Sequence, residues 1–177
     1  GLREWHDLLP SLVAHELPLP VGVDDKLLKR IEQEGLKMMS TFLTSGGQVD
    51  SERRTEGLHL AVGLLVQDIT GILEASAAGK HVPLFKLYSA HDTTILPLLL
   101  VLGLQRDEWP PFASSLVFEL WYSPNRKQHF VRIIFNKEVL QLEGCSDGLC
   151  SLSHFNKMLR PYIPLDWADS CKSNKSV

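Results

Sequence analysis

The 177-residue sequence lacks the features that mark membrane-embedded and nucleic-acid-binding chains. Its 18 basic and 21 acidic residues form no long run of either sign, so a basic surface for DNA or RNA is not predicted. The longest apolar run, residues 95–104, is too short to cross a bilayer and is interrupted by Pro97 and Gly103. We therefore expect no nucleic-acid partner and no transmembrane segment.

Cysteine is scarce, and all three cysteines lie in the last third of the sequence. Cys145 and Cys150 flank the short loop GCSDGLC and are candidates for a local disulfide, which leaves Cys171 without a partner in this sequence. The odd cysteine fits either a reduced thiol or a secreted or luminal chain whose partner cysteine lies elsewhere. No histidine stands at a recognised zinc spacing around the pair, so we expect no metal and no cofactor.

Length and composition indicate one globular domain with a sizeable core. Apolar residues make up 44% of the sequence and charged residues 22%, which are ordinary values for a folded chain. Residues 1–20 have no basic start, continuous apolar stretch or small-residue cleavage site, so a signal peptide is not predicted there. Helical and strand patterns both occur, and the expected fold class is α/β.

Two amphipathic helices are predicted in the first half of the sequence. The first begins at Asp24, and its apolar residues recur at helical spacing as far as the glycines at 46 and 47. The second covers residues 55–78 and ends at Gly79. Its expected apolar stripe consists of Leu58, Val62, Leu65, Ile69 and Ile72. His59 falls off this stripe, and we expect it to be a surface histidine.

Residues 84–104, LFKLYSAHDTTILPLLLVLGL, form the stretch on which a functional hypothesis can be built. The apolar run 84–88 is typical of a strand, the polar residues that follow indicate a turn, and an apolar helix is predicted from Asp92. Ligands of open α/β sheets usually bind where a strand's carboxyl end meets a helix's amino end. We call residues 88–92 the elbow, and we expect the functional residues there.

The second half of the sequence is expected to form strands and a final helix. Residues 115–122, 129–135 and 138–142 are short runs rich in Val, Ile, Phe and Leu, and the last two should form a hairpin around Asn136-Lys137. Residues 151–162 have apolar side chains at helical spacing. No internal repeat or low-complexity segment is present.

Asp92 permits two interpretations. As a helix N-cap, its carboxylate would accept hydrogen bonds from the amide donors of the first turn. As a general acid, it would protonate a leaving oxygen while His91 donates a hydrogen bond to an oxyanion. Because a helix amino end attracts anions, the second interpretation favours phosphate as the ligand and acidic pH for activity. Propensity alone leaves both interpretations open.

Other kinds of hydrolytic site fit the elbow less well. Ser89 and His91 are two residues apart on one turn and cannot take the line of nucleophile, base and orienting acid that a serine triad needs. A metal-dependent phosphohydrolase would need further ligand pairs, and the sequence contains no recognisable ones.

Four blocks of the sequence resemble, in order and spacing, the carboxyl-terminal half of the histidine acid phosphatases, including the prostatic, lysosomal and lysophosphatidic acid phosphatase types. They are LYSAHDTT, WPPFASSLVFELW, GCSDGLCSLSHF and PLDWADSC. The resemblance covers most of the chain and is weakest before about residue 50. It implies a segment of a three-layer α/β/α core, with residues 1–50 in or beside a helical cap and residues 51–177 in the core.

The resemblance also implies roles for individual residues. His91 would bind phosphate and Asp92 would be the proton donor, with Ser89 and Glu119 in supporting positions. Without the resemblance, Glu119 would be interpreted as an ion-pair partner on a strand. Cys171 resembles a cysteine that bridges to the amino-terminal half in this family.

The family hydrolyses phosphate monoesters through a phosphohistidine and needs no metal, but its nucleophile lies in an Arg-His-Gly motif that these 177 residues do not contain. The sequence is therefore expected to be a carboxyl-terminal segment that is inactive by itself. Two hypotheses follow: an acid phosphatase whose site is completed elsewhere, or a non-catalytic family member that acts as a binding module.

The resemblance also bears on ligands, assembly and compartment. The expected ligand is a phosphate monoester, with lysophosphatidic acid as one candidate, and an exposed docking surface would favour a homodimer. By the resemblance, the protein would be secreted or lysosomal. If it is of the lysophosphatidic acid type, it would be mitochondrial.

Overall fold

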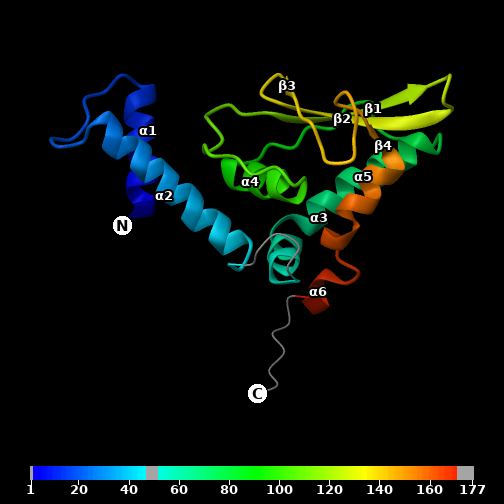
Figure 1. The fold of residues 1–177 in the computed structure, drawn as a ribbon, viewed down its shortest axis with the longest axis horizontal. Coiled ribbons are helices and arrows are strands. Elements are labelled where there is room, and N and C mark those ends of the chain that lie inside the picture. Colours follow the sequence, from blue (N-terminus) through cyan, green and yellow to red (C-terminus); the bar gives the residue numbers. More distant parts are fainter. Residues whose placement is uncertain (1, 47–51, 171–177) are drawn as a thin grey trace, which may run out of the picture.

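The computed structural model describes residues 2–46 and 52–170 (Figure 1). The helices are α1 (Leu2–Ala14), α2 (Asp25–Leu43), α3 (Glu52–Ala77), α4 (Asp92–Val101), α5 (Leu152–Leu159), the 3-10 helix η1 (Arg160–Tyr162) and α6 (Trp167–Ser170). The strands are β1 (Leu116–Ser123), β2 (Gln128–Phe135), β3 (Glu138–Val139) and β4 (Cys150–Ser151). Helices and strands thus occur together, which confirms the predicted α/β class.

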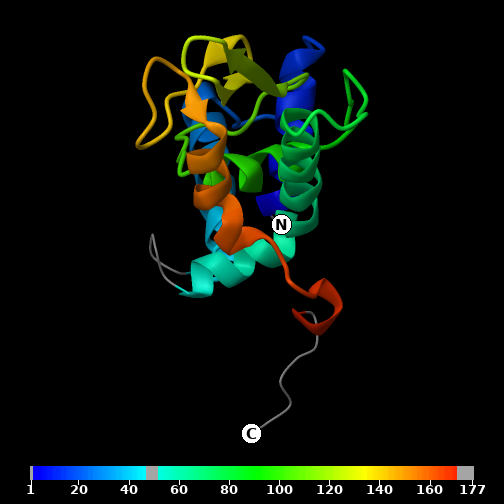
Figure 2. The same ribbon diagram turned by 90° about the vertical axis from the view of Figure 1, so that its right-hand side faces the viewer.

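The strands form one antiparallel sheet in the order β1-β2-β3, with β4 pairing with β2 beside β3. The helices α3, α4 and α5 lie on one face of this sheet (Figures 1 and 2). The hairpin around Asn136-Lys137 is confirmed, and both residues have the positive φ that tight hairpin turns need. The third predicted strand is shorter than expected, because only Glu138 and Val139 pair with β2.

The helix α4 is the centre of the core. It is apolar on all sides, and its buried residues run from Leu96 to Val101 without a break. All of them except Pro97 belong to one cluster with Val131 and Ile133 of β2 and with Phe155 of α5. Pro97 lies inside α4, and the helix continues through it as its second turn begins.

The helices in the first half follow the local sequence signals. Asp24 caps α2 by accepting a hydrogen bond from the Leu27 amide at 2.8 Å, as the predicted start requires. Along α3 the buried apolar side chains are Leu58, Val62, Val66, Ile69 and Leu73. The predicted Leu65 and Ile72 are only half-buried. At these two turns the residue that faces the core is the next one along the chain, Val66 or Leu73.

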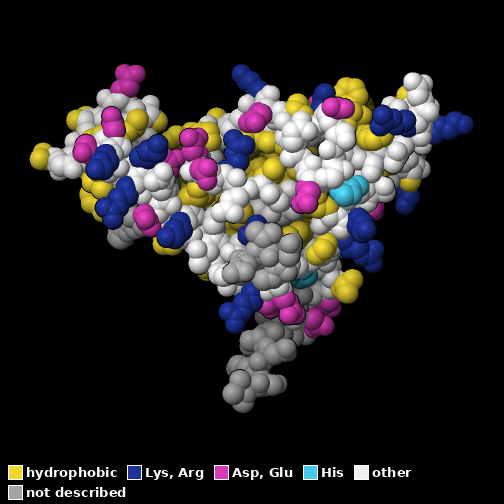
Figure 3. Space-filling view, viewed as in Figure 1, with side chains coloured by type: hydrophobic (Ala, Val, Ile, Leu, Met, Phe, Trp, Pro, Cys, Tyr) yellow, Lys and Arg dark blue, Asp and Glu magenta, His cyan; other side chains and the backbone are white. Residues whose placement is uncertain are grey.

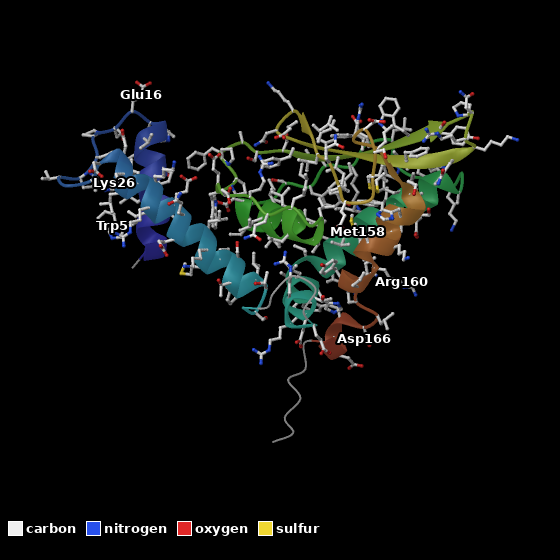
Figure 4. The ribbon with its side chains drawn as sticks, in the orientation of Figure 1. Trp5, Glu16, Lys26, Met158, Arg160 and Asp166 are labelled. Carbon is white, nitrogen blue, oxygen red and sulfur yellow. A yellow bond between two sulfur atoms is a disulfide. The ribbon has the colours of Figure 1, made fainter. Side chains whose placement is uncertain are left out.

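The pair α1 and α2 projects from the sheet-and-helix unit (Figure 1), and Trp5, Glu16 and Lys26 mark this projecting part in Figure 4. The α2 helix contacts α3 and α4 at its carboxyl-terminal end. Its assignment to a cap, and that of residues 51–177 to a core, remain predictions.

The α3 helix is also, by length and composition, the one helix in the described ranges that could cross a membrane. Of its most apolar window, 33% is buried in the fold. Since the buried stripe of α3 packs into the core, the helix also has the pattern of a core helix in a globular domain.

The predicted strand at residues 84–88 is wrong. These residues belong to no strand, and Leu84, Phe85 and Leu87 are largely exposed. A strand requires a hydrogen-bonding neighbour, and the sheet of β1 to β4 does not extend to this segment. The sequence pattern of a strand is present, but the described chain offers it no partner.

Gly63 allows α3 to approach the segment after α5. A Cβ atom there would lie 2.5 Å from the Tyr162 carbonyl oxygen and 2.9 Å from Cδ of Pro164. Gly71, two turns later in the same helix, has no atom within 4 Å of such a Cβ. These two glycines thus form a matched pair.

We expect Gly63→Ala to lower the free energy of unfolding by about 1–3 kcal/mol, because the backbone of Tyr162 must move away. Gly71→Ala should instead raise it by up to about 1 kcal/mol, since alanine favours the helix more than glycine. Urea denaturation followed by circular dichroism measures both. Equal effects of the two substitutions would contradict the close packing of α3 against η1.

Candidate active site

The elbow brings His91 and Asp92 to the amino end of α4. His91 is the N-cap residue, with extended backbone, and its carbonyl oxygen accepts from the amides of Thr94 at 2.9 Å and Ile95 at 3.1 Å. The imidazole of His91 makes no capping hydrogen bond. Both side chains are exposed to solvent.

Asp92 occupies the first helical position and not the N-cap position that propensity allowed. Its Oδ1 accepts a hydrogen bond from the Thr93 amide at 2.7 Å. Its Oδ2 accepts one from the indole Nε1 of Trp109 at 2.6 Å. The carboxylate is therefore fixed from both sides, by its own helix and by a residue 17 positions further along the chain.

Trp109 is a site residue that the sequence analysis did not identify. It begins the rigid turn Trp-Pro-Pro, is half-buried and packs against the core cluster. The two prolines restrict the backbone around it and so limit the positions that the indole can take. The Trp-Pro-Pro signal was visible in the sequence, but nothing in it indicated contact with Asp92.

A second polar group ties the elbow to α3. Asp68 Oδ2 accepts from Lys86 Nζ and from the Tyr88 hydroxyl, each at 2.6 Å. The hydrogen bond from Lys86, followed by that from Tyr88, holds the pKa of Asp68 below its usual value. Desolvation, together with the bond to Asp68, raises the pKa of Tyr88. The segment before His91 is thus held by polar side chains, although it lacks strand pairing.

Glu119 does not join the elbow through any hydrogen bond or ion pair in the described chain. Its Oε2 accepts from Arg132 Nε at 2.7 Å, and Nη2 of Arg132 lies 2.7 Å from the same atom. Trp121 Nε1 donates to it at 3.0 Å. The hydrogen bond from Arg132 is the main reason that the pKa of Glu119 is lowered. This geometry supports the ion-pair interpretation of Glu119.

The remaining predicted residues are distributed as follows. Ser89 is exposed, and no hydrogen bond joins it to His91 or Asp92 within the described residues. Cys145 and Cys150 form a disulfide, as the sequence predicted. Cys171, expected to bridge elsewhere, lies outside the described residues. His59 is half-buried at the border of the α3 stripe, not fully at the surface.

A cavity of about 760 Å³ lies at the other end of α4 from the elbow. Its walls come from α2, the start of α3, the end of α4 and the chain after α4, and they include Lys37, Arg54, Leu100 and Arg106. Two of these cations are already engaged: Arg54 with the Leu100 carbonyl oxygen and Arg106 with Glu138. On the face drawn in Figure 3, basic and acidic side chains are interspersed, so charge does not mark a single binding surface there.

The group around Asp68 generates a pH prediction. The pKa of Tyr88 is raised in the folded chain, so folding favours the protonated phenol. The stabilisation that the Tyr88–Asp68 hydrogen bond gives is therefore fully present below the ordinary pKa of 10.0, and it is lost as the pH rises through the raised pKa of the folded chain. We expect Asp68→Asn to move the pKa of Tyr88 down towards its ordinary value. Phenolate absorbance over a pH titration measures this.

Asp107→Asn is the matched control. Asp107 lies in the chain after the carboxyl end of α4, and its substitution should leave the titration of Tyr88 unchanged. An unchanged titration in Asp68→Asn would show that Asp68 does not contact the elbow in solution.

Comparison with known proteins shows the family to which the chain belongs. The family model of the histidine phosphatase superfamily (branch 2) matches residues 31–136. Lysophosphatidic acid phosphatase type 6 of Bos taurus is 34% identical over 111 residues, which cover 60% of this chain and 26% of that protein. Lysosomal acid phosphatase of Bos taurus is 31% identical over 173 residues, which cover 94% of this chain and 39% of that protein.

Two further proteins extend the comparison. The 2-phosphoxylose phosphatase 1 of Xenopus tropicalis is 45% identical over 92 residues, covering 50% of this chain and 17% of that protein. The phytase from Citrobacter braakii has a similar fold, with a TM-score of 0.68 and 16% sequence identity. This structural match covers 98% of this chain and 50% of the phytase chain. In these matches the chain spans 17% to 50% of its relatives' lengths. The family match over 31–136 shows that this chain belongs to the histidine phosphatase superfamily, branch 2.

Proposed function

We propose that this chain supplies the phosphate-binding and proton-donating part of a phosphate monoesterase site. The observation that carries the proposal is the Asp92 carboxyl, fixed beside His91 at the amino end of α4 by Thr93 and Trp109. The similarity of the chain to proteins named as phosphatases supports hydrolysis of phosphate esters as the class of reaction.

The chemistry follows from the position of the two side chains. A phosphate group at the start of α4 would meet the positive end of the helix dipole and a hydrogen-bond donor from the His91 imidazole. Asp92, when protonated, would transfer its proton to the leaving alcohol oxygen as the phosphorus–oxygen bond breaks. The names of two relatives, lysosomal and prostatic acid phosphatase, support activity at acidic pH.

In this proposal the nucleophile would come from a segment other than these 177 residues. The family resemblance implies a phosphohistidine formed on an Arg-His-Gly motif, and the 177 residues contain no such tripeptide. The chain would then need a completing segment for turnover, and the elbow would hold the phosphate and the acid. No metal enters this scheme.

Trp109 has a distinct part in the proposal. It holds Oδ2 of Asp92 through its indole N–H and so acts as a positioning residue, not as a catalytic one. A general acid matters most when the leaving group is a poor one, such as an alkoxide, because that oxygen cannot depart without a proton. Loss of the indole should therefore affect alkyl phosphates more than aryl phosphates.

A second candidate function is a non-catalytic binding module. It is favoured by the missing Arg-His-Gly tripeptide and by the exposed apolar residues Leu84, Phe85 and Leu87 just before the elbow. In this case the chain would bind a phosphate group without hydrolysing its ester. The same exposed segment supports the homodimer as a proposal, which sedimentation of the purified chain tests.

Phosphate affinity tests the binding part of the proposal. We expect His91→Ala to weaken binding of inorganic phosphate by about tenfold, since a hydrogen bond to a charged group is lost. Isothermal titration calorimetry at about pH 5 measures the affinity of the chain. His15→Ala, a substitution of an exposed histidine after α1, is the control and should bind as the wild type does. Equal affinities in both variants would exclude His91 as a phosphate ligand.

Hydrolysis tests the catalytic part. If the chain turns over phosphate monoesters, Asp92→Asn should lower the rate with an alkyl phosphate by about 10²–10⁴-fold and the rate with p-nitrophenyl phosphate much less. Trp109→Phe should show the same preference with a smaller loss. Released phosphate is the readout. No turnover above the Asp92→Asn background with either ester would favour the binding module, and equal losses with both esters would contradict the acid role.

A further inference from the structure

Three metal-ligating side chains lie together outside the elbow, one in the turn before β4, one in β4 and one in the first turn of α5. One atom each from Cys145, Cys150 and His154, two sulfurs and a ring nitrogen, lie within 4.8 Å of one another. In the structure the two sulfurs are joined as a disulfide. Linear spacing hides this group, because His154 reaches the cysteine pair only through the first turn of α5.

Non-covalent contacts hold the two cysteines in place in addition to the disulfide. Cys150 pairs with Val131 of the sheet, and the Cys145 amide donates to the Leu142 carbonyl oxygen at 3.1 Å. Between them, Ser146 and Leu149 exchange two backbone hydrogen bonds at 2.9 and 3.3 Å. These contacts would keep the two sulfurs close after the bond between them is broken.

A second set of contacts positions His154. The Ser151 hydroxyl caps α5 by accepting from the His154 amide at 3.3 Å. Nε2 of the imidazole lies 3.1 Å from the Glu143 carbonyl oxygen, and this contact limits the orientation of the ring. Contacts of this kind, between a histidine ring and a backbone carbonyl, commonly orient metal-ligating histidines. Gly144 permits the approach, because a Cβ there would lie 2.8 Å from Nε2.

The surroundings of the sulfurs are apolar. Cys150 is 2% exposed, and with Cys145 it borders a small pocket whose walls include Val131, Ile133, Leu140 and Leu142. His154 is more exposed than Cys150, so a cation would enter from the histidine side. An apolar shell around a metal site limits the access of solvent to it.

We propose that reduction of the Cys145–Cys150 disulfide opens a binding site for one zinc-type divalent cation, held by the two thiolates and His154. A dithiol reductant supplies two electrons and two protons: the S–S bond breaks, two S–H groups form, and the reductant closes to its own disulfide. The cation then displaces both thiol protons. Two sulfurs and one imidazole suit Zn²⁺ or Co²⁺ in tetrahedral geometry, with water in the fourth position.

The site would work as a redox-controlled switch of the turn. Oxidation closes the loop covalently and removes both sulfur ligands, whereas reduction with metal closes it by coordination. This inference does not depend on the phosphatase proposal, because it concerns a turn at the start of α5 and uses neither His91 nor Asp92.

The test uses the full 177-residue chain with Cys171→Ser, so that the third cysteine cannot contribute. Co²⁺ is added to this protein in its oxidised form and after reduction by a dithiol that is then removed under anaerobic conditions. We expect thiolate-to-cobalt charge-transfer absorption at one equivalent in the reduced protein only. Zn²⁺ should bleach this absorption and raise the melting temperature of the reduced protein, because it binds the folded state.

Variants decide which ligands are used. Cys150→Ser should abolish the charge-transfer absorption, and His154→Gln should weaken Co²⁺ binding by about tenfold or more. His15→Gln is the control and should bind as the parent does.

Three outcomes would overturn the proposal. They are absence of charge-transfer absorption in the reduced parent, unchanged affinity in His154→Gln, and a reduced protein whose folded circular dichroism spectrum is lost and is not restored by Zn²⁺.

Discussion

The burial of α4 is the constraint on which the rest of the structure depends. Its side chains from Leu96 to Val101 are buried, and the helix packs against α3 and α2 within the core cluster that also includes residues of β2 and α5. Burial of six successive residues gives a free-energy gain that a surface helix of ten residues would not have. The position of the elbow follows directly, because His91 and Asp92 are the first residues of this helix.

The elbow combines a rigid foundation with an open polar end. Trp109 and Thr93 fix the Asp92 carboxyl, while Lys86 and Tyr88 are held by Asp68 of α3. Hydrogen bonds to carboxylates thus replace the strand pairing that is missing at residues 84–88. Such exposed contacts are worth less than burial, and they orient side chains more than they stabilise the fold. This arrangement suits the anion site that we propose at the elbow, where a few well-placed donors would contact a small anion.

The same design recurs at the turn before α5. There, paired backbone hydrogen bonds and the Ser151 cap bring Cys145, Cys150 and His154 together, and the core beneath them supplies the apolar wall. Both polar groups sit at the amino end of a helix that is anchored in the core. In each case a helix with buried side chains fixes the backbone, and short local contacts orient the polar groups at its first turn.

The sequence by itself determined the elements whose signals are local. Asp24 caps α2, the turn Asn136-Lys137 joins β2 to β3, and α4 begins at the elbow because apolar residues follow Asp92 there. The family could also be identified from motifs, since these are short and stand in order along the chain. The disulfide was predictable because its two cysteines are five positions apart.

Only the tertiary structure decided what depends on distant neighbours. Residues 84–88 have a strand's pattern but no pairing partner, and pairing is a property of two segments. The contact of Trp109 with Asp92 and that of Arg132 with Glu119 join residues 17 and 13 positions apart, so no local pattern reveals them. Local periodicity reports which face of an element is apolar, whereas the folded chain determines which groups face each other.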